Sequence, residues 1–174
     1  MTASTLPLLF LDVDGPLIPF GATREQRPDG YPTYQGARIP RRTGTNPLIT
    51  RINPALGPLL LALPCTLVWA TTWMSDANDT VAPWLGLPEL PVVDWPDPTD
   101  DDPVGGLHWK TRPLLDWAAG RPFAWIDDEI TDRDRTWVEA HHPARSRLHR
   151  IDPRHGLADQ DIVALDQWLR RHQG

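Results

Sequence analysis

The sequence predicts an α/β fold in which five short, mainly parallel strands form a sheet between two layers of helices. Two observations support this prediction. Apolar segments of strand length alternate with segments of helix length along the chain, which is typical of a parallel sheet whose strands are joined by crossover helices. Three of the predicted strands also end directly at polar side chains, as expected where the carboxyl ends of parallel strands form a site.

Five strands and five helices are expected along the chain. The predicted strands cover residues 8–11, 66–70, 90–93, 122–126 and 147–151. The predicted helices cover residues 53–63, 75–85, 108–119, 132–140 and 157–171. The helix boundaries rest on capping, proline and glycine residues, and the last helix also has apolar residues at helical spacing.

Residues 16–54 interrupt this alternation after the first strand. Turn-forming residues separate two β-like pieces, at residues 31–39 and 48–52, which predict a short hairpin-like insertion beside the strand ends. Six arginines lie in the insertion, at Arg24, Arg27, Arg38, Arg41, Arg42 and Arg51. They form either a contact surface for an anionic substrate or a solvated loop face. Residues 1–174 are expected to form one domain, with residues 55–174 as the remainder of its core.

The composition is that of a globular protein. Hydrophobic residues make up 40% of the 174 residues and charged residues 23%, and the formal net charge of -6 disfavours a general affinity for nucleic acid or anionic membranes. The single Cys65 rules out a disulfide framework. No segment resembles a signal peptide or reaches membrane-spanning length. We therefore expect a cytoplasmic protein with no membrane partner, and the sequence indicates no stable protein partner.

The first predicted strand ends at two carboxylates, Asp12 and Asp14, and Gly15 follows them. One interpretation is that these acids cap a turn, where Asp is frequent. A calcium loop of the EF-hand type is disfavoured, because it needs a third oxygen ligand before the glycine and a distant Glu. The choice between a turn and a functional site depends on which side chains the other strand ends supply.

Polar side chains also follow two later strands, and a lysine begins a helix. Thr71 follows the strand at residues 66–70, Asp127 and Asp128 follow the strand at residues 122–126, and Lys110 lies in the first turn of a helix. Carboxylates crowded at one edge of a sheet need a cation, because like charges raise one another's pKa. Mg²⁺ with oxygen ligands meets this need. Lys and Thr opposite the metal then suit an anion, and the inferred ligand is a phosphoryl group.

In this respect the sequence resembles the haloacid dehalogenase (HAD) superfamily of phosphohydrolases, whose four motifs are matched in order. The matches are Asp12-Val13-Asp14-Gly15 for DxD, Thr71 for the strand-end Thr or Ser, Lys110 for the Lys, and Asp127-Asp128 with Asp132 for the acidic motif. The resemblance implies a Rossmann-like three-layer sandwich. Residues 67–73 and 123–129 resemble a small capless bacterial subgroup, some of it related to HAD domains attached to RNA-repair enzymes. Phospho-receiver domains use similar residues, but in them the acidic pair comes first.

The resemblance also implies a role for each residue. Asp12 is expected to be the nucleophile that attacks phosphorus and forms an aspartyl-phosphate. Asp14 is expected to protonate the leaving oxygen and then to activate water. Mg²⁺ is expected to be held by Asp12, the backbone carbonyl of Asp14, and Asp128.

The remaining motif residues are expected to hold the phosphoryl group or to orient its neighbours. Thr71, which is preferred to Thr72 because it comes first after the strand, and Lys110 are expected to bind phosphoryl oxygens. Asp127 and Asp132 are expected to orient the metal's waters or Lys110.

Taken together, these features predict a Mg²⁺-dependent phosphohydrolase acting on a phosphomonoester such as a nucleotide or a nucleic-acid end. The insertion is too short for a large cap domain, and capless members of the superfamily tend to accept bulky substrates. The alternative is a HAD-fold binding or regulatory protein that turns over little. It is motivated by Pro16, which lacks a backbone N–H where the superfamily usually has Thr or Val.

Overall fold

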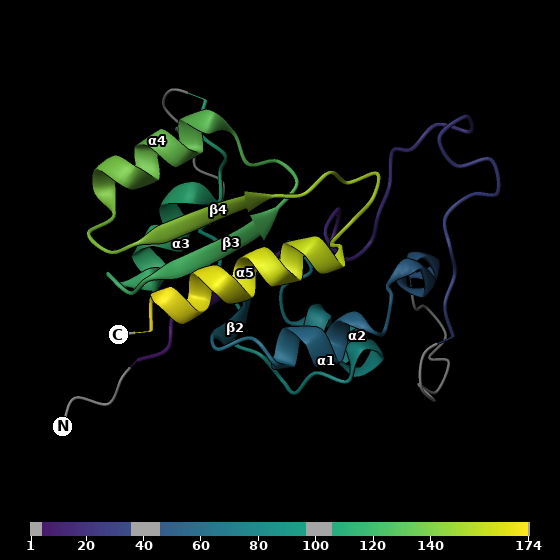
Figure 1. Cartoon of the computed structure of the whole chain (residues 1–174), viewed down its shortest axis with the longest axis horizontal. Helices are drawn as coiled ribbons and strands as arrows, with labels where there is room; N and C mark the ends of the chain where they lie inside the picture. Colours follow the sequence, from purple (N-terminus) through teal and green to yellow (C-terminus); the bar gives the residue numbers. More distant parts are fainter. Residues whose placement is uncertain (1–4, 36–45, 97–105, 174) are drawn as a thin grey trace.

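The computed structural model describes residues 5–35, 46–96 and 106–173, and its centre is a parallel sheet (Figure 1). The strands are β1 (Leu8–Leu11), β2 (Thr66–Trp69), β3 (Phe123–Asp127) and β4 (Ser146–Arg150). Their order across the sheet is β2-β1-β3-β4, and every neighbouring pair is parallel. All four strands therefore bring their carboxyl ends to the same edge of the sheet.

Helices cover both faces of the sheet, which gives three layers. One face packs against α1 (Leu56–Leu61), α2 (Asp76–Leu85) and α5 (Asp159–Arg171), and the other against α3 (Thr111–Ala118) and α4 (Asp132–His141). Side chains of β1 alternate between the two cores, as the pleat of a strand requires. Leu9 and Leu11 join the first core, whereas Leu8 and Phe10 join the second.

The predicted α/β architecture is thus present, but the prediction of five strands is wrong for the described residues, which form a four-stranded sheet. The expected strand at residues 90–93 is reduced to a single bridge between Trp69 and Val92. The N–H of Trp69 donates to the carbonyl of Pro91, and the N–H of Val93 donates to the carbonyl of Trp69. Pro91 has no N–H of its own, so the ladder cannot extend along this segment.

The insertion also differs from its prediction. Residues 48–52 do not form a strand, because residues Pro47–Arg51 form a 3-10 helix, η1. The side chain of Asn46 accepts a hydrogen bond from the N–H of Leu48, and Pro47 occupies the first turn, where a missing N–H costs nothing. Residues 31–35 are not extended into a strand either, and residues 36–39 lie outside the described residues.

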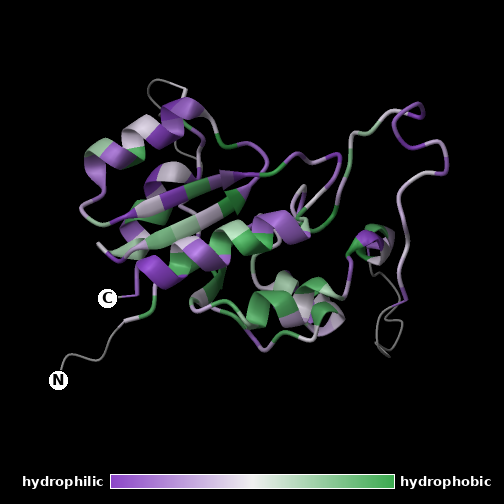
Figure 2. Cartoon of the chain, viewed as in Figure 1, coloured by the Kyte–Doolittle hydropathy of each residue, from purple (hydrophilic) through white to green (hydrophobic). Residues whose placement is uncertain are grey.

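The described part of the insertion extends from the edge of the sheet where the strands end. In Figure 1 its purple and blue trace lies beyond the arrowheads of β3 and β4. Figure 2 shows this trace as mostly hydrophilic, whereas α1 and α2 are largely hydrophobic. Arg38, Arg41 and Arg42 of the predicted basic surface lie outside the described residues. No helix in the described ranges combines the length and the apolar character needed to cross a membrane.

Candidate active site

Asp12 follows β1 directly, and both of its carboxylate oxygens are engaged. The side chain is buried, which places a charged group among the apolar ends of the strands. Its Oδ1 atom accepts a hydrogen bond from the N–H of Val13 at 2.8 Å, and its Oδ2 atom lies 2.9 Å from Nζ of Lys110. These contacts fix the orientation of the carboxylate at the carboxyl edge of the sheet.

Lys110 lies at the start of α3 and bridges two carboxylates. Its Nζ atom lies 2.9 Å from Oδ2 of Asp12 and 2.8 Å from Oδ2 of Asp127, and the side chain is buried. Burial lowers the pKa of Lys110, but the charges of Asp12 and Asp127 raise it more, so the pKa lies above its usual value. The lysine is therefore a fixed positive charge between β1 and β3.

Three acids at this edge are close enough to share a cation. Carboxylate oxygens of Asp12, Asp127 and Asp128 lie within 4.8 Å of one another. Burial raises the pKa of Asp12 to about 7, and burial together with the charge of Asp127 raises the pKa of Asp128 to about 6. The three carboxylates outnumber the single ammonium of Lys110, so a divalent cation with oxygen ligands fits this set of donors.

A second group of possible metal ligands shares Asp127 with the first. It consists of His108, Asp127 and Glu129. Both ring nitrogens of His108 already have partners, because Nδ1 accepts from the N–H of Lys110 at 3.1 Å and Nε2 lies 3.0 Å from Oε2 of Glu129. The first group, which keeps carboxylate oxygens facing one another, suits a hard cation better.

Gly15 allows Asp128 to approach the loop after β1. The residue has φ +93°, and a Cβ atom at this position would lie 2.7 Å from Cγ of Asp128. Glycine is therefore required here both for its backbone conformation and for the space that it leaves. The backbone carbonyl of Asp128 is held from the other side, by a 3.0 Å hydrogen bond from Nε of Arg150.

Trp73 connects the other two predicted site residues, Asp14 and Thr71. Its indole N–H donates to Oδ2 of Asp14 at 2.9 Å, and its backbone N–H donates to Oγ1 of Thr71 at 3.2 Å. Thr71 is buried whereas Thr72 is exposed. Sequence reasoning missed Trp73, because no spacing rule links an indole to a carboxylate 59 residues away.

Asp132 does not contact Lys110, and the expectation that it orients the metal's waters or the lysine needs correction. Its side chain is fully exposed at the first turn of α4 and pairs with Arg135 at 2.9 Å.

Asp134, two residues further along α4, is buried instead. It accepts hydrogen bonds from four donors: the N–H of His108, Oγ1 of Thr111, and the N–H and Oγ1 of Thr131. Asp134 therefore ties the start of α4 to the segment that carries Lys110.

The sequence contained a signal for Asp134, in that Thr131 and Asp134 have the spacing of a capping box. The structure shows both halves of this box at the start of α4. Its second function, which is to hold the segment before α3, depends on tertiary packing and has no local signal.

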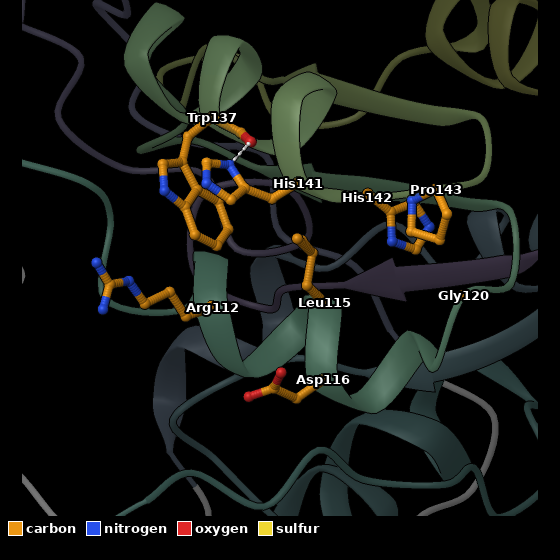
Figure 3. A pocket seen from close by; sticks show the side chains of 8 residues that line it. All are labelled: Arg112, Leu115, Asp116, Gly120, Trp137, His141, His142 and Pro143. Atoms are coloured by element: carbon orange, nitrogen blue, oxygen red, sulfur yellow. Dashed lines mark hydrogen bonds between the residues drawn. The ribbon is translucent and has the colours of Figure 1, made fainter.

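A separate pocket lies between α3 and α4. Its volume is about 370 Å³, and Figure 3 shows Trp137 and His141 of α4 over Leu115 of α3. The rings of Trp137 and His141 are stacked at 4.2 Å, and the guanidinium of Arg112 lies 5.6 Å from the Trp137 ring. Asp12, Lys110, Asp127 and Asp128 are not among the residues that line this pocket, so it is distinct from the acid site.

The fold agrees with that of the HAD superfamily. A parallel α/β sheet carries an Asp pair, a Thr, a Lys and a second acidic pair along one edge. The profile of a more specific family, the HAD domain in Swiss Army Knife RNA repair proteins, matches residues 8–162. The chain therefore belongs to this family of HAD domains. Comparison with curated proteins and with solved structures found no match.

Proposed function

We propose that the protein is a Mg²⁺-dependent phosphohydrolase that acts on a phosphomonoester through an aspartyl-phosphate on Asp12. The observation that carries this proposal is the position of Lys110, whose Nζ atom lies between the carboxylates of Asp12 and Asp127. Asp128 is close enough to share a cation with these two carboxylates. Family membership supports hydrolase chemistry in general, and the geometry supplies an oriented nucleophile next to a fixed positive charge.

The chain's own residues divide the reaction between them. Asp12, oriented by Val13 and Lys110, attacks phosphorus, and the bond to the leaving oxygen breaks. Asp14 donates a proton to that oxygen and then takes one from the water that hydrolyses the aspartyl-phosphate. The indole of Trp73 orients Asp14 for both proton transfers. Thr71 keeps a hydroxyl proton available for a phosphoryl oxygen, because its Oγ1 serves as acceptor towards Trp73.

Mg²⁺ is the cofactor that the donor set suits. Asp12, Asp128 and the backbone carbonyl of Asp14 would hold it, and Asp127 would orient Lys110 beside it. When bound, the metal offsets the negative charge of the acids and of the phosphoryl group.

A nucleic-acid end or nucleotide is the proposed substrate class. A pocket of about 240 Å³ lies between the insertion and the loop after β4, lined in part by Arg27, Arg154 and His155. This loop packs against the residues after β1, since the N–H of Leu157 donates to the carbonyl of Pro16 at 2.8 Å. The basic side chains of this pocket therefore adjoin the segment that follows β1, in a chain with net charge -6, and they suit a substrate with further phosphates. The family name points the same way, since it describes RNA repair proteins.

Release of phosphate is the test of this proposal. p-Nitrophenyl phosphate, nucleoside monophosphates and phosphorylated oligonucleotides are assayed with and without Mg²⁺, beside Asp14→Asn. We expect turnover that needs the metal and is lost in the variant. Absence of turnover on every substrate, with Mg²⁺ still bound, would support the alternative of a binding or regulatory protein. This alternative is suggested by Pro16, which lacks a backbone N–H.

A further inference from the structure

An exposed indole borders the acid site. Trp109 precedes Lys110 in the chain and is 42% exposed, whereas Lys110 is buried. The Nζ atom of Lys110 lies 5.5 Å from the centre of the Trp109 ring and 2.9 Å from Oδ2 of Asp12. One side chain therefore separates the nucleophile from a large aromatic residue that is partly exposed to solvent.

Two aromatic neighbours hold this indole in place. The ring of His108 stacks on it at 5.6 Å with an interplanar angle of 28°, and Trp95 meets it edge to face at 4.9 Å. Both neighbours are fixed in turn, because Nε1 of Trp95 donates to the carbonyl of Thr71 at 3.0 Å and His108 accepts from the N–H of Lys110. A ring restrained in this way loses little conformational entropy when a ligand covers it.

We propose that Trp109 is a stacking platform for the base of a nucleotide whose phosphoryl group is bound beside Asp12 by Thr71 and Lys110. This inference rests on the proposed phosphohydrolase function and adds to it a residue that selects the substrate. Exposed apolar surface of this size is costly in water, and the flat face of any nucleobase can cover it. A sugar phosphate without a base binds the same threonine and lysine but leaves the indole uncovered. The arginines of the pocket between the insertion and the loop after β4 suit a run of phosphates, which favours a nucleotide over a phosphorylated protein side chain.

Adenosine monophosphate and ribose 5-phosphate form a matched pair of ligands, because they differ only by the base. Their binding is measured by calorimetry in an Asp12→Asn background, where we expect no turnover, at a Mg²⁺ concentration that a separate titration shows to saturate this variant. We expect the nucleotide to bind about 5- to 150-fold more tightly, as one base stacked on an aromatic side chain implies.

Trp109→Ala should remove most of this ratio of affinities, and Trp109→Phe should restore part of it. Trp137→Ala, which removes a half-buried indole of the separate pocket, should leave the ratio unchanged.

Other results would overturn the inference. Equal binding of the two ligands, no detectable binding of the nucleotide, or tighter binding of a phosphotyrosine peptide would each show that Trp109 does not select a base. An equal loss for both ligands in Trp109→Ala would show that the indole only shields Lys110. Because binding is measured without turnover, failure of the phosphohydrolase proposal appears separately, as an unmodified chain that binds the nucleotide but releases no phosphate.

Discussion

At the scale of single residues, the site depends on how closely Asp128 approaches Gly15. A side chain at position 15 would overlap the Asp128 carboxylate, and that carboxylate is one of the three that can share a cation. Small displacements of such a ligand weaken a metal site strongly, because hard cations need their oxygen ligands at defined distances.

Gly15→Ala should therefore weaken Mg²⁺ binding by at least about tenfold, in the range seen when a metal ligand loses its supporting contacts. Gly21→Ala is the matched control, because Gly21 also has positive φ (+80°) but has nothing within 4 Å of an added Cβ. Both variants should lose about 1–2 kcal/mol of stability from backbone strain. Mg²⁺ titrations by calorimetry check this prediction, and equal metal affinity in the two variants would contradict it.

The raised pKa values of the acids predict how metal binding depends on pH. Asp12 has a pKa of about 7 in the folded chain without metal, against 3.8 as its usual value. Between these pH values the folded chain holds more protons than the unfolded chain, so its stability falls as the pH rises. Metal ligands must be deprotonated, so the stabilisation by Mg²⁺ should grow over the same range. Thermal unfolding with and without Mg²⁺ should show a larger increase in Tm near pH 8 than near pH 5, and an increase independent of pH would refute this.

At the scale of elements, the position of Lys110 depends on contacts between α3 and α4. Asp134 at the start of α4 accepts hydrogen bonds from His108 and Thr111, on both sides of the lysine. Hydrogen bonds from Thr131, Thr111 and the N–H of His108 keep this buried acid ionised, and its pKa lies below the usual value despite burial. The Asp134 carboxylate therefore connects the start of α4 to the segment that carries Lys110.

Asp134→Asn should lower stability by about 2–4 kcal/mol, because the amide replaces one carboxylate oxygen with an NH2 group, and the donors that faced that oxygen lose their acceptor. It should also lower kcat, since the segment that carries Lys110 loses its anchor. Asp132→Asn is the matched control in the same turn of α4. Its exposed side chain predicts a change within about 0.5 kcal/mol. Urea unfolding and phosphate release compare the two, and similar effects would restore a site role to Asp132.

The contact between the insertion and the loop after β4 predicts that this surface binds nucleic-acid ends with an affinity that depends on salt. Arg27 donates to the carbonyl of Arg154 and lies over the Tyr31 ring at 4.8 Å, which places its charge at the pocket. Arg27→Glu should raise KM for a phosphorylated oligonucleotide by about tenfold and reduce its dependence on salt. Arg170→Glu, at the far end of α5, should change neither. Unchanged kinetics in Arg27→Glu would remove the insertion from the binding surface.

At the scale of the whole molecule, the parallel sheet explains why residues far apart in sequence form one site. Strands β2, β1 and β3 are neighbours in register, so the residues after them meet at one edge. This much was predictable, since the apolar runs of strand length before Asp12, Thr71 and Asp127 each end at a polar side chain.

Other parts could not be predicted because they depend on local competition or on tertiary contacts. The expected strand at residues 90–93 pairs only weakly, because Pro91 removes a donor from the ladder. The expected strand at residues 48–52 becomes η1, because Asn46 and Pro47 favour a helical turn over an extended chain. The roles of Trp73 and Asp134 arise from contacts with distant segments, which no single stretch of sequence contains.

The central claim is that Asp12 carries the phosphoryl group during the reaction. Acid quenching during turnover, followed by mass spectrometry of the peptide that contains Asp12, tests it most directly. We predict one added phosphoryl group on this peptide, formed only with Mg²⁺, absent in Asp12→Asn and accumulating in Asp14→Asn, where hydrolysis of the intermediate lacks its base. Phosphate release that continues in Asp12→Asn, or turnover without any phosphoryl group on this peptide, would contradict the account.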